Sequence, residues 1–257
     1  MKIISWNLNG IRAVFRKNEL QNLFEKFPAE IYLFQEIKID AAAFSIFAEN
    51  FPQFFCAANC AAKKGYAGSA IFVDEKFAAK KNLKFVKNLQ NLADDEGRVL
   101  RVEFDDFAIF SVYFPNGGKS PAAWKFKLKF YEKFLAEISA LRKTGKKVIF
   151  GGDVNCAATK IDLARPREND GKIGFHPAER AALAKFKSEN FVDFFREKFP
   201  RQISYSWWDL KTRARERNVG WRLDYFFGDE IFLPRIKKIE YLNSQFGSDH
   251  CPVFLEI

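Results

Sequence analysis

Short apolar segments are the feature of this sequence that most limits its possible folds. Helical periodicity covers only four segments, 19–27, 41–49, 122–143 and 177–189. Because strands outnumber helices and hairpins mix with βα crossovers, the pattern predicts an α/β protein of packed sheets with helices outside, not a simple doubly wound sheet. The ten predicted strands are runs of four to eight residues: 2–6, 30–34, 54–57, 69–73, 98–104, 107–114, 147–150, 223–227, 236–242 and 252–257.

The chain of 257 residues contains no linker rich in Gly, Ser or Pro, so we expect one domain over residues 1–257. No apolar run approaches the 18 residues of a membrane span, and the N-terminus turns polar too early for a signal peptide. The four cysteines form no C-x-x-C pair and only two histidines are present. A zinc site or a disulfide framework is therefore not expected, and a reducing cytoplasmic location fits better.

The formal net charge of +10 indicates an anionic partner, which nucleic acid, a phosphorylated ligand or a membrane surface would each satisfy. Basic residues concentrate in two regions. Residues 119–147 contain nine Lys and Arg against two Glu, mostly on a predicted helix, and a solvated helix face is the simpler interpretation. The second region, residues 207–222, interleaves tryptophan with Lys and Arg.

Four predicted strands end in polar residues. Segment 3–6 leads into Asn7, 31–34 into Glu36, 109–114 into Asn116 and 148–150 into Asp153 and Asn155. Asn and Gly at any single strand end would be explained by a turn. Four such ends with amides, carboxylates and a tyrosine, Tyr113, favour a functional site at one sheet edge.

Phosphodiester hydrolysis requires these residue types, because the charge on the phosphate must be neutralised, water deprotonated and the leaving oxygen stabilised. Mg²⁺ suits the first and third roles and prefers a few carboxylate or amide oxygens. Candidates near predicted strand ends are Asn7, Glu36, Asp153, Asn155, Asp224, Asp249 and His250. Without further context, His250 would be an ordinary loop histidine and Asp153 a turn cap.

Five motifs occur in order along the chain and remove that ambiguity. They are 6–12 (WNLNGIR), 35–38 (QEIK), 152–157 (GDVNCA) with Asp162, 218–225 (NVGWRLDY) and 248–252 (SDHCP). Together they resemble the exonuclease III family of abasic-site (AP) endonucleases, within the endonuclease/exonuclease/phosphatase fold. The likeness covers the whole chain, and the fourth motif is closer to the animal-type AP endonuclease branch. The resemblance implies a four-layer α/β sandwich, with two packed mixed β-sheets flanked by helices, as in deoxyribonuclease I-like proteins.

The resemblance also implies roles for individual residues. Glu36 would be the principal Mg²⁺ ligand, with Mn²⁺ able to substitute, and the implied metal site comprises Asn7, Glu36, Asp153, Asn155, Asp249 and His250. Asp153 would activate water, Asn155 and Tyr113 would contact the phosphate, His250 would donate to a phosphate oxygen and Asp224 would orient His250.

A physical argument supports the pairing of Asp224 with His250. Adjacent strand residues point to opposite faces, so Asp249 is poorly placed to support its neighbour His250. A carboxylate on another strand does this better and raises the imidazole pKa. The argument requires that residues 248–250 do not form a turn.

For substrate binding, the resemblance places Trp207, Trp221 and Leu223 in a pocket for the abasic sugar and Lys119 in a DNA-contacting loop. Basic residues of 207–222 would hold the flanking phosphates. A buried core position is the commoner fate of a single tryptophan, and the roles of Lys119 and Lys211 stay open.

The resemblance thus implies a Mg²⁺-dependent DNA repair nuclease that hydrolyses the phosphodiester 5′ to abasic sites and leaves a 3′-hydroxyl. 3′–5′ exonuclease and 3′-phosphodiesterase activities are also expected, on double-stranded DNA with blocked or recessed 3′ ends, by a monomer. The alternatives are a phosphodiesterase of the same fold acting on a non-DNA substrate such as an inositol lipid, and a catalytically weak nucleic-acid-binding protein.

Overall fold

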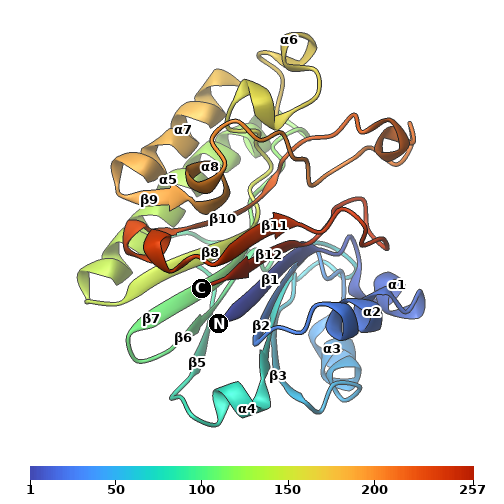
Figure 1. Cartoon of the computed structure of the whole chain (residues 1–257), viewed down its shortest axis with the longest axis vertical. Coiled ribbons are helices and arrows are strands. Elements are labelled where there is room, and N and C mark those ends of the chain that lie inside the picture. The colour runs from blue at the N-terminus through green and yellow to red at the C-terminus, as the bar shows by residue number, and fades with distance from the viewer.

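Two six-stranded sheets form the centre of the protein in a computed structural model that describes all residues from 1 to 257 (Figure 1). The first sheet has the order β11 (Lys238–Tyr241), β12 (Val253–Glu256), β1 (Lys2–Asn7), β2 (Ile31–Gln35), β4 (Ser69–Asp74), β3 (Phe54–Asn59). The second has the order β5 (Lys84–Lys87), β6 (Val99–Glu103), β7 (Phe107–Tyr113), β8 (Lys147–Asp153), β10 (Asp224–Asp229), β9 (Phe191–Asp193).

Each sheet is mixed and contains one parallel pair, β1 with β2 and β7 with β8. A parallel pair requires a crossover connection, and helices supply both. Helices α1 (Ile11–Arg16) and α2 (Glu19–Lys26) connect the first pair, and α5 (Pro121–Lys143) connects the second. In each parallel pair, the carboxyl ends of the two strands lie together at the same edge of their sheet.

Three hydrophobic layers hold the sandwich together. The largest lies between the sheets and includes Leu33 and Ile71 of one sheet and Ile109 and Phe226 of the other. Two outer layers lie under the helices and are dominated by phenylalanine, such as Phe134 of α5. The four layers of helices, sheet, sheet and helices confirm the predicted fold.

All ten predicted strands and all four predicted helical segments are present, the latter as α2, α3 (Ala41–Ala48), α5 and α7 (Pro177–Ser188). The sequence analysis missed the edge strands β5 and β9 and several short helices. His176, which matched no catalytic motif, accepts a hydrogen bond from the Ala178 N–H and caps α7. The missed helices are α1, α4 (Glu75–Ala78), α6 (Pro166–Asn169), α8 (Phe194–Lys198) and the 3₁₀ turns 160–162, 214–217 and 230–235.

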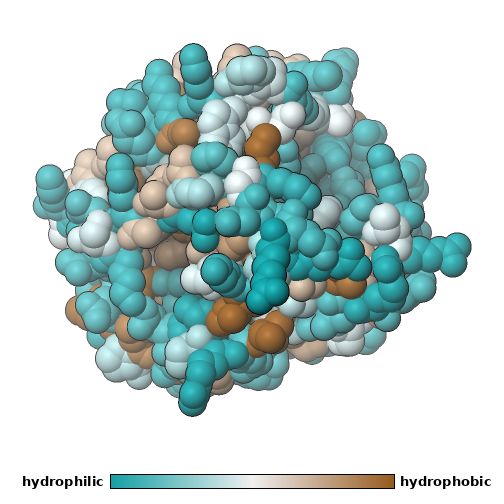
Figure 2. Space-filling model, turned by 90° about the horizontal axis from the view of Figure 1, so that it is seen from above, coloured by the Kyte–Doolittle hydropathy of each residue, from teal (hydrophilic) through white to brown (hydrophobic).

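The two ends of the chain lie side by side, where the Met1 amino group donates to the Ile257 carbonyl over 2.6 Å (Figure 1). None of the helices combines the length and apolarity that crossing a bilayer requires. Figure 2 shows the molecule from above, after a 90° turn from the view of Figure 1. The surface on this side is mostly hydrophilic, and its hydrophobic side chains form small separate patches. That face therefore offers no broad apolar docking surface.

Candidate active site

The ends of five strands, from both sheets, meet at the site. Strand pairing places Tyr113 of β7 and Asp224 of β10 on either side of Asp153 at the end of β8. In the other sheet, Asn7 ends β1 opposite Gln35, the residue before Glu36. The expected edge site is therefore assembled by strand register.

Asn7 links the two sheets through hydrogen bonds. Its side-chain amide donates to Glu36 Oε1 and to Asp153 Oδ2, each over 2.9 Å, while its oxygen accepts from the Asn9 N–H. By donating to both, the Asn7 amide holds the carboxylates of Glu36 and Asp153 close together. Its oxygen, the atom that a metal would require, accepts one hydrogen bond, from the Asn9 N–H.

Glu36 is fixed by its backbone and by a nearby cation. Its φ of 47° is unusual for a residue with a long side chain, and such conformations cost about 1–3 kcal/mol and concentrate at functional sites. Glu36 Oε2 lies 2.8 Å from Lys38 Nζ. Burial acts to raise the pKa of Glu36, but Lys38 and the Asn7 amide outweigh it and hold the pKa below its ordinary value.

Asp153 differs from Glu36 in its environment. It is almost fully buried, and burial raises its pKa to about 7 despite the attraction of His250. Its Oδ1 accepts from the Asn155 N–H over 2.8 Å, and its Oδ2 accepts from the Asn155 side-chain amide over 3.2 Å. A carboxylate with a pKa near neutrality can both take up and release a proton.

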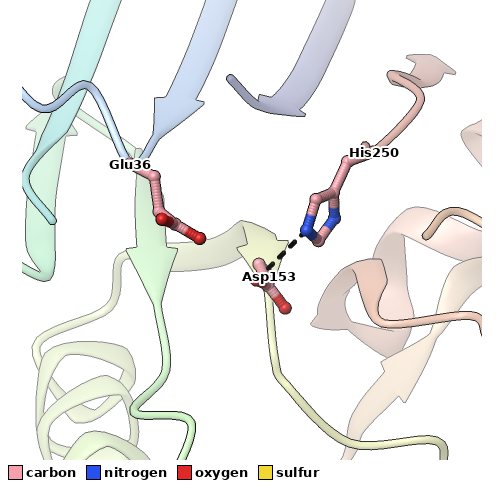
Figure 3. Close-up of side chains that lie close together, drawn as sticks. All are labelled: Glu36, Asp153 and His250. Carbon is pink, nitrogen blue, oxygen red and sulfur yellow. Dashed lines mark ion pairs between the residues drawn. The ribbon is translucent and has the colours of Figure 1, made fainter. Parts of the chain in front are cut away.

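His250 faces both Asp224 and Asp153. Its Nδ1 lies 2.7 Å from Asp224 Oδ2. Its Nε2 lies 3.9 Å from Asp153 Oδ2, the ion pair marked in Figure 3. Burial acts to lower the imidazole pKa, but Asp224 and then Asp153 raise it to about 10. The imidazole is therefore protonated at neutral pH and can donate a hydrogen bond to an anion.

The predicted pairing of Asp224 with His250 is present, but the argument used for it was wrong. Residues 247–249 form a bend instead of an extended strand, so side-chain alternation does not apply there. The Asp249 carboxylate instead accepts hydrogen bonds from Asn9 Nδ2 and Trp207 Nε1, each over 3.0 Å.

Glu36, Asp153 and His250 could hold a metal ion, because one ligand atom from each lies within 4.8 Å of the others. Two carboxylates this close favour a bound cation, and their oxygens suit a hard divalent ion. The imidazole could join them only when neutral. Asp249, also expected as a ligand, is not part of this cluster. Asn7 and Asn155 lie directly beside it, since the side-chain amide of each donates to Asp153 Oδ2. Asn155 Oδ1 accepts from the Asn116 amide over 3.2 Å.

A cavity of about 430 Å³ adjoins these groups. Trp207, Trp221 and Leu223 line it as expected, and so does Tyr113. Trp207 and Trp221 exchange two backbone hydrogen bonds of 2.9 Å, which fixes their indoles as neighbouring walls. Trp208, in contrast, is buried in the core.

Tyr113 reaches the cavity from the end of β7. Burial raises its pKa well above the ordinary value, and Glu36 and Asp153 act in the same direction, so the phenol stays a neutral donor. The Arg98 guanidinium stacks 4.9 Å from the ring centre and donates to the Tyr113 carbonyl.

Two basic residues, Arg222 and Lys127, lie elsewhere than expected. Lys119, expected in a DNA-contacting loop, lies outside the cavity, and its ammonium is 4.2 Å from the centre of the Tyr66 ring. Arg222 is completely buried in ion pairs with Asp162 and Asp193, so it cannot contact DNA. Lys127, assigned to a solvated helix face, is also completely buried.

Sequence reasoning missed several contributors to the site. Ile173 and Gly174 line the cavity, and the Ser206 hydroxyl accepts from the N–H groups of Leu223 and Asp224. No motif marks these residues. Their positions depend on loops whose packing partners are distant in sequence.

Comparison with known proteins adds independent information. Residues 4–250 match the model of the Endonuclease/Exonuclease/phosphatase family. The chain is 36% identical to the exodeoxyribonuclease of Bacillus subtilis, covering 100% of this chain and 99% of that protein. It is 33% identical to the DNA repair nuclease APEX1 of Danio rerio, covering 99% and 81%.

Solved structures show the same architecture. The 3′-5′ exonuclease NExo of Neisseria meningitidis superposes with a TM-score of 0.89 at 24% identity, covering 100% of this chain and 99% of that one. The AP endonuclease LMAP of Leishmania major gives a TM-score of 0.89 at 24% identity, covering 99% and 86%. At this level of identity, the likeness concerns the fold.

Proposed function

Since this chain belongs to the endonuclease/exonuclease/phosphatase family and is a phosphodiester-hydrolysing DNA repair nuclease, we propose that it cleaves DNA 5′ to abasic sites and leaves a 3′-hydroxyl. One observation carries the proposal: an aromatic-walled cavity opens directly beside Glu36, Asp153 and His250. Two indoles can pack against a sugar that lacks a base, whereas an intact nucleotide requires more room.

The family's divalent metal is proposed to be Mg²⁺, with Mn²⁺ able to substitute. Glu36 and Asp153 would hold it, because their oxygens converge and only Asn7 donates between them. Bound there, Mg²⁺ would neutralise charge on the phosphate and stabilise the leaving oxygen.

The chain's own residues would perform the proton chemistry. Asp153 would take a proton from water, since its pKa of about 7 makes it a base near neutral pH. Protonated His250 would donate to a phosphate oxygen, held in orientation by Asp224. Tyr113 would donate a second hydrogen bond from the opposite side of Asp153. Asn155 would contact the phosphate, and Asp249 would orient Trp207 through the indole N–H.

We extend the proposal to the 3′ end of DNA. A 3′-5′ exonuclease is among the structural neighbours, and the same cavity of about 430 Å³ would also accept a frayed or blocked 3′ terminus. Double-stranded DNA would be bound by a monomer, in the cytoplasm and on the nucleoid. Lys119 and the exposed Lys211 would contact flanking phosphates.

The decisive experiment compares three duplexes: one with an abasic analogue, one undamaged and one with a recessed 3′ end. In Mg²⁺, a single nick 5′ to the lesion is expected, and excess chelator should abolish it. Equal cleavage of the undamaged and abasic duplexes, or digestion restricted to 3′ ends, would contradict the abasic-site assignment.

A further inference from the structure

A buried ion pair lies behind the site. Lys127 of α5 and Glu179 of α7 are both completely buried and form a salt bridge with each other. Removing two charges from water is unfavourable unless their remaining hydrogen-bonding capacity is also used. The groups that use this capacity are loops of the active site.

Lys127 binds two of these loops. Its ammonium donates to the Asn155 carbonyl over 2.7 Å and to the Asn116 carbonyl over 3.1 Å. The side chains of Asn116 and Asn155 are themselves hydrogen-bonded and line the cavity. A single buried cation therefore fixes the backbone at the end of β8 and the loop that follows β7.

Glu179 binds a third loop. Its Oε2 accepts from the Gly174 N–H over 2.7 Å and from the His176 N–H over 3.0 Å. Gly174 lies against the Trp221 ring, since a Cβ at this glycine would come 3.3 Å from Trp221 Cζ3. The Gly174 carbonyl also accepts from the Ala157 N–H over 2.8 Å. This hydrogen bond joins the loop that contains Gly174 to the loop that follows β8.

We propose that Lys127 and Glu179 are positioning residues, which hold Asn155 beside Asp153 and hold Gly174 against the tryptophan wall of the cavity. This rests on the proposed function for its catalytic consequence. Neither residue lines the cavity, so neither touches the substrate. Because the hydrogen bonds of this pair go to loops that line the cavity, losing the pair should affect those loops before the rest of the fold.

The test removes both charges together, because a single substitution leaves an uncompensated buried charge. The double variant Lys127→Met/Glu179→Gln is compared with Arg101→Met/Glu137→Gln. Arg101 and Glu137 form a second buried pair, 2.7 Å apart. Glu137 lies on the same helix ten residues beyond Lys127, or about 15 Å along its axis.

Three measurements are made on each protein: melting temperature, hydrogen exchange of backbone amides in 154–157 and 173–176, and kcat with KM on the abasic duplex. In Lys127→Met/Glu179→Gln, exchange in both segments should rise at least about tenfold, and kcat should fall about 10–100-fold with KM changed less than about threefold. Arg101→Met/Glu137→Gln should leave both segments and kcat as in the wild type.

Unchanged exchange and unchanged kcat in the folded double variant would overturn the proposal. Equal effects in the two double variants would overturn it too, since they would indicate general destabilisation. Should Lys127→Met/Glu179→Gln not fold, Glu179→Asp, which keeps the charge and withdraws the carboxylate from the loop, is judged by the same exchange criterion for 173–176. Failure of the wild type to cleave abasic DNA would instead refute the proposed function. In that case the hydrogen-exchange result alone would decide whether Lys127 and Glu179 position the loops.

Discussion

At the scale of single residues, two groups with displaced pKa values set the expected pH dependence. Asp153 must be ionised to accept a proton and His250 must be protonated to donate one. The pKa of about 7 for Asp153 applies without bound metal, and a divalent cation beside this carboxylate lowers its pKa. At saturating metal, activity should therefore rise with pH in a range below about 7 and fall as pH increases through about 10. Asp224→Asn removes the charge that keeps His250 protonated, so the alkaline limb should move down by at least about one pH unit. Single-turnover rates at saturating metal measure both limbs; an unshifted alkaline limb would contradict the role of Asp224.

Asp153→Asn should abolish chemistry and change how stability depends on pH. Burial raises the pKa of Asp153 above its unfolded value, so its favourable contribution to folding is complete only at low pH and is lost as pH rises through about 7. The amide does not titrate, although it loses part of the hydrogen bonding to Asn7 and Asn155. The melting temperature of the wild type should therefore fall more between pH 5 and pH 8 than that of the variant. Duplex binding should persist while single-turnover cleavage falls by at least about 100-fold; near-normal cleavage would refute the base assignment.

At the scale of elements, the two tryptophan segments form one wall. Trp221→Ala should impair cleavage at abasic sites more than binding of undamaged duplex, because phosphate contacts dominate non-specific affinity. The loss should be about 1–3 kcal/mol, comparable with base stacking on an aromatic ring. Trp208→Ala is the matched control, since that indole is in the core and should mainly lower the melting temperature. A Trp221→Ala protein with lower stability but unchanged abasic selectivity would show that Trp221 is merely structural.

The pairing of β7 with β8 depends on one glycine. A Cβ at Gly152 would lie 1.9 Å from the Val112 carbonyl oxygen, so no larger residue fits without separating the strands. Gly152→Ala should destabilise the protein by about 2–4 kcal/mol and displace Asp153. Chemical denaturation measures the change; a loss below about 0.5 kcal/mol would show that the strands adjust freely.

The same elements show what could be predicted from sequence. Strands with buried faces, such as β2 and β8, are recognisable in the sequence as apolar runs. The polar residues at their ends, Glu36 and Asp153, could therefore be predicted as site residues. The edge strands β5 and β9 were missed because they are only four and three residues long, too short for a periodic pattern to show. The burial of Lys127 and Arg222 was unpredictable from local sequence, since their partners Glu179 and Asp193 lie far along the chain.

At the scale of the whole molecule, the net charge of +10 predicts how DNA binding responds to salt. Lys and Arg at the interface displace condensed counterions from phosphates, so affinity for undamaged duplex should fall steeply between about 50 and 200 mM salt. Fluorescence anisotropy with a labelled duplex measures the slope. A flat dependence would mean that the positive charge is not presented to DNA and would favour a small phosphodiester substrate.

The pairing of β1 with β12 has a consequence for the order of folding during synthesis. The first and last strands are hydrogen-bonded neighbours inside one sheet, and His250 lies just before β12. A growing chain therefore leaves one side of β1 unpaired until β12 has been synthesised. A chain interrupted before residue 250 would lack both the imidazole and the strand that pairs with β1, so premature termination should yield an unstable protein without nuclease activity.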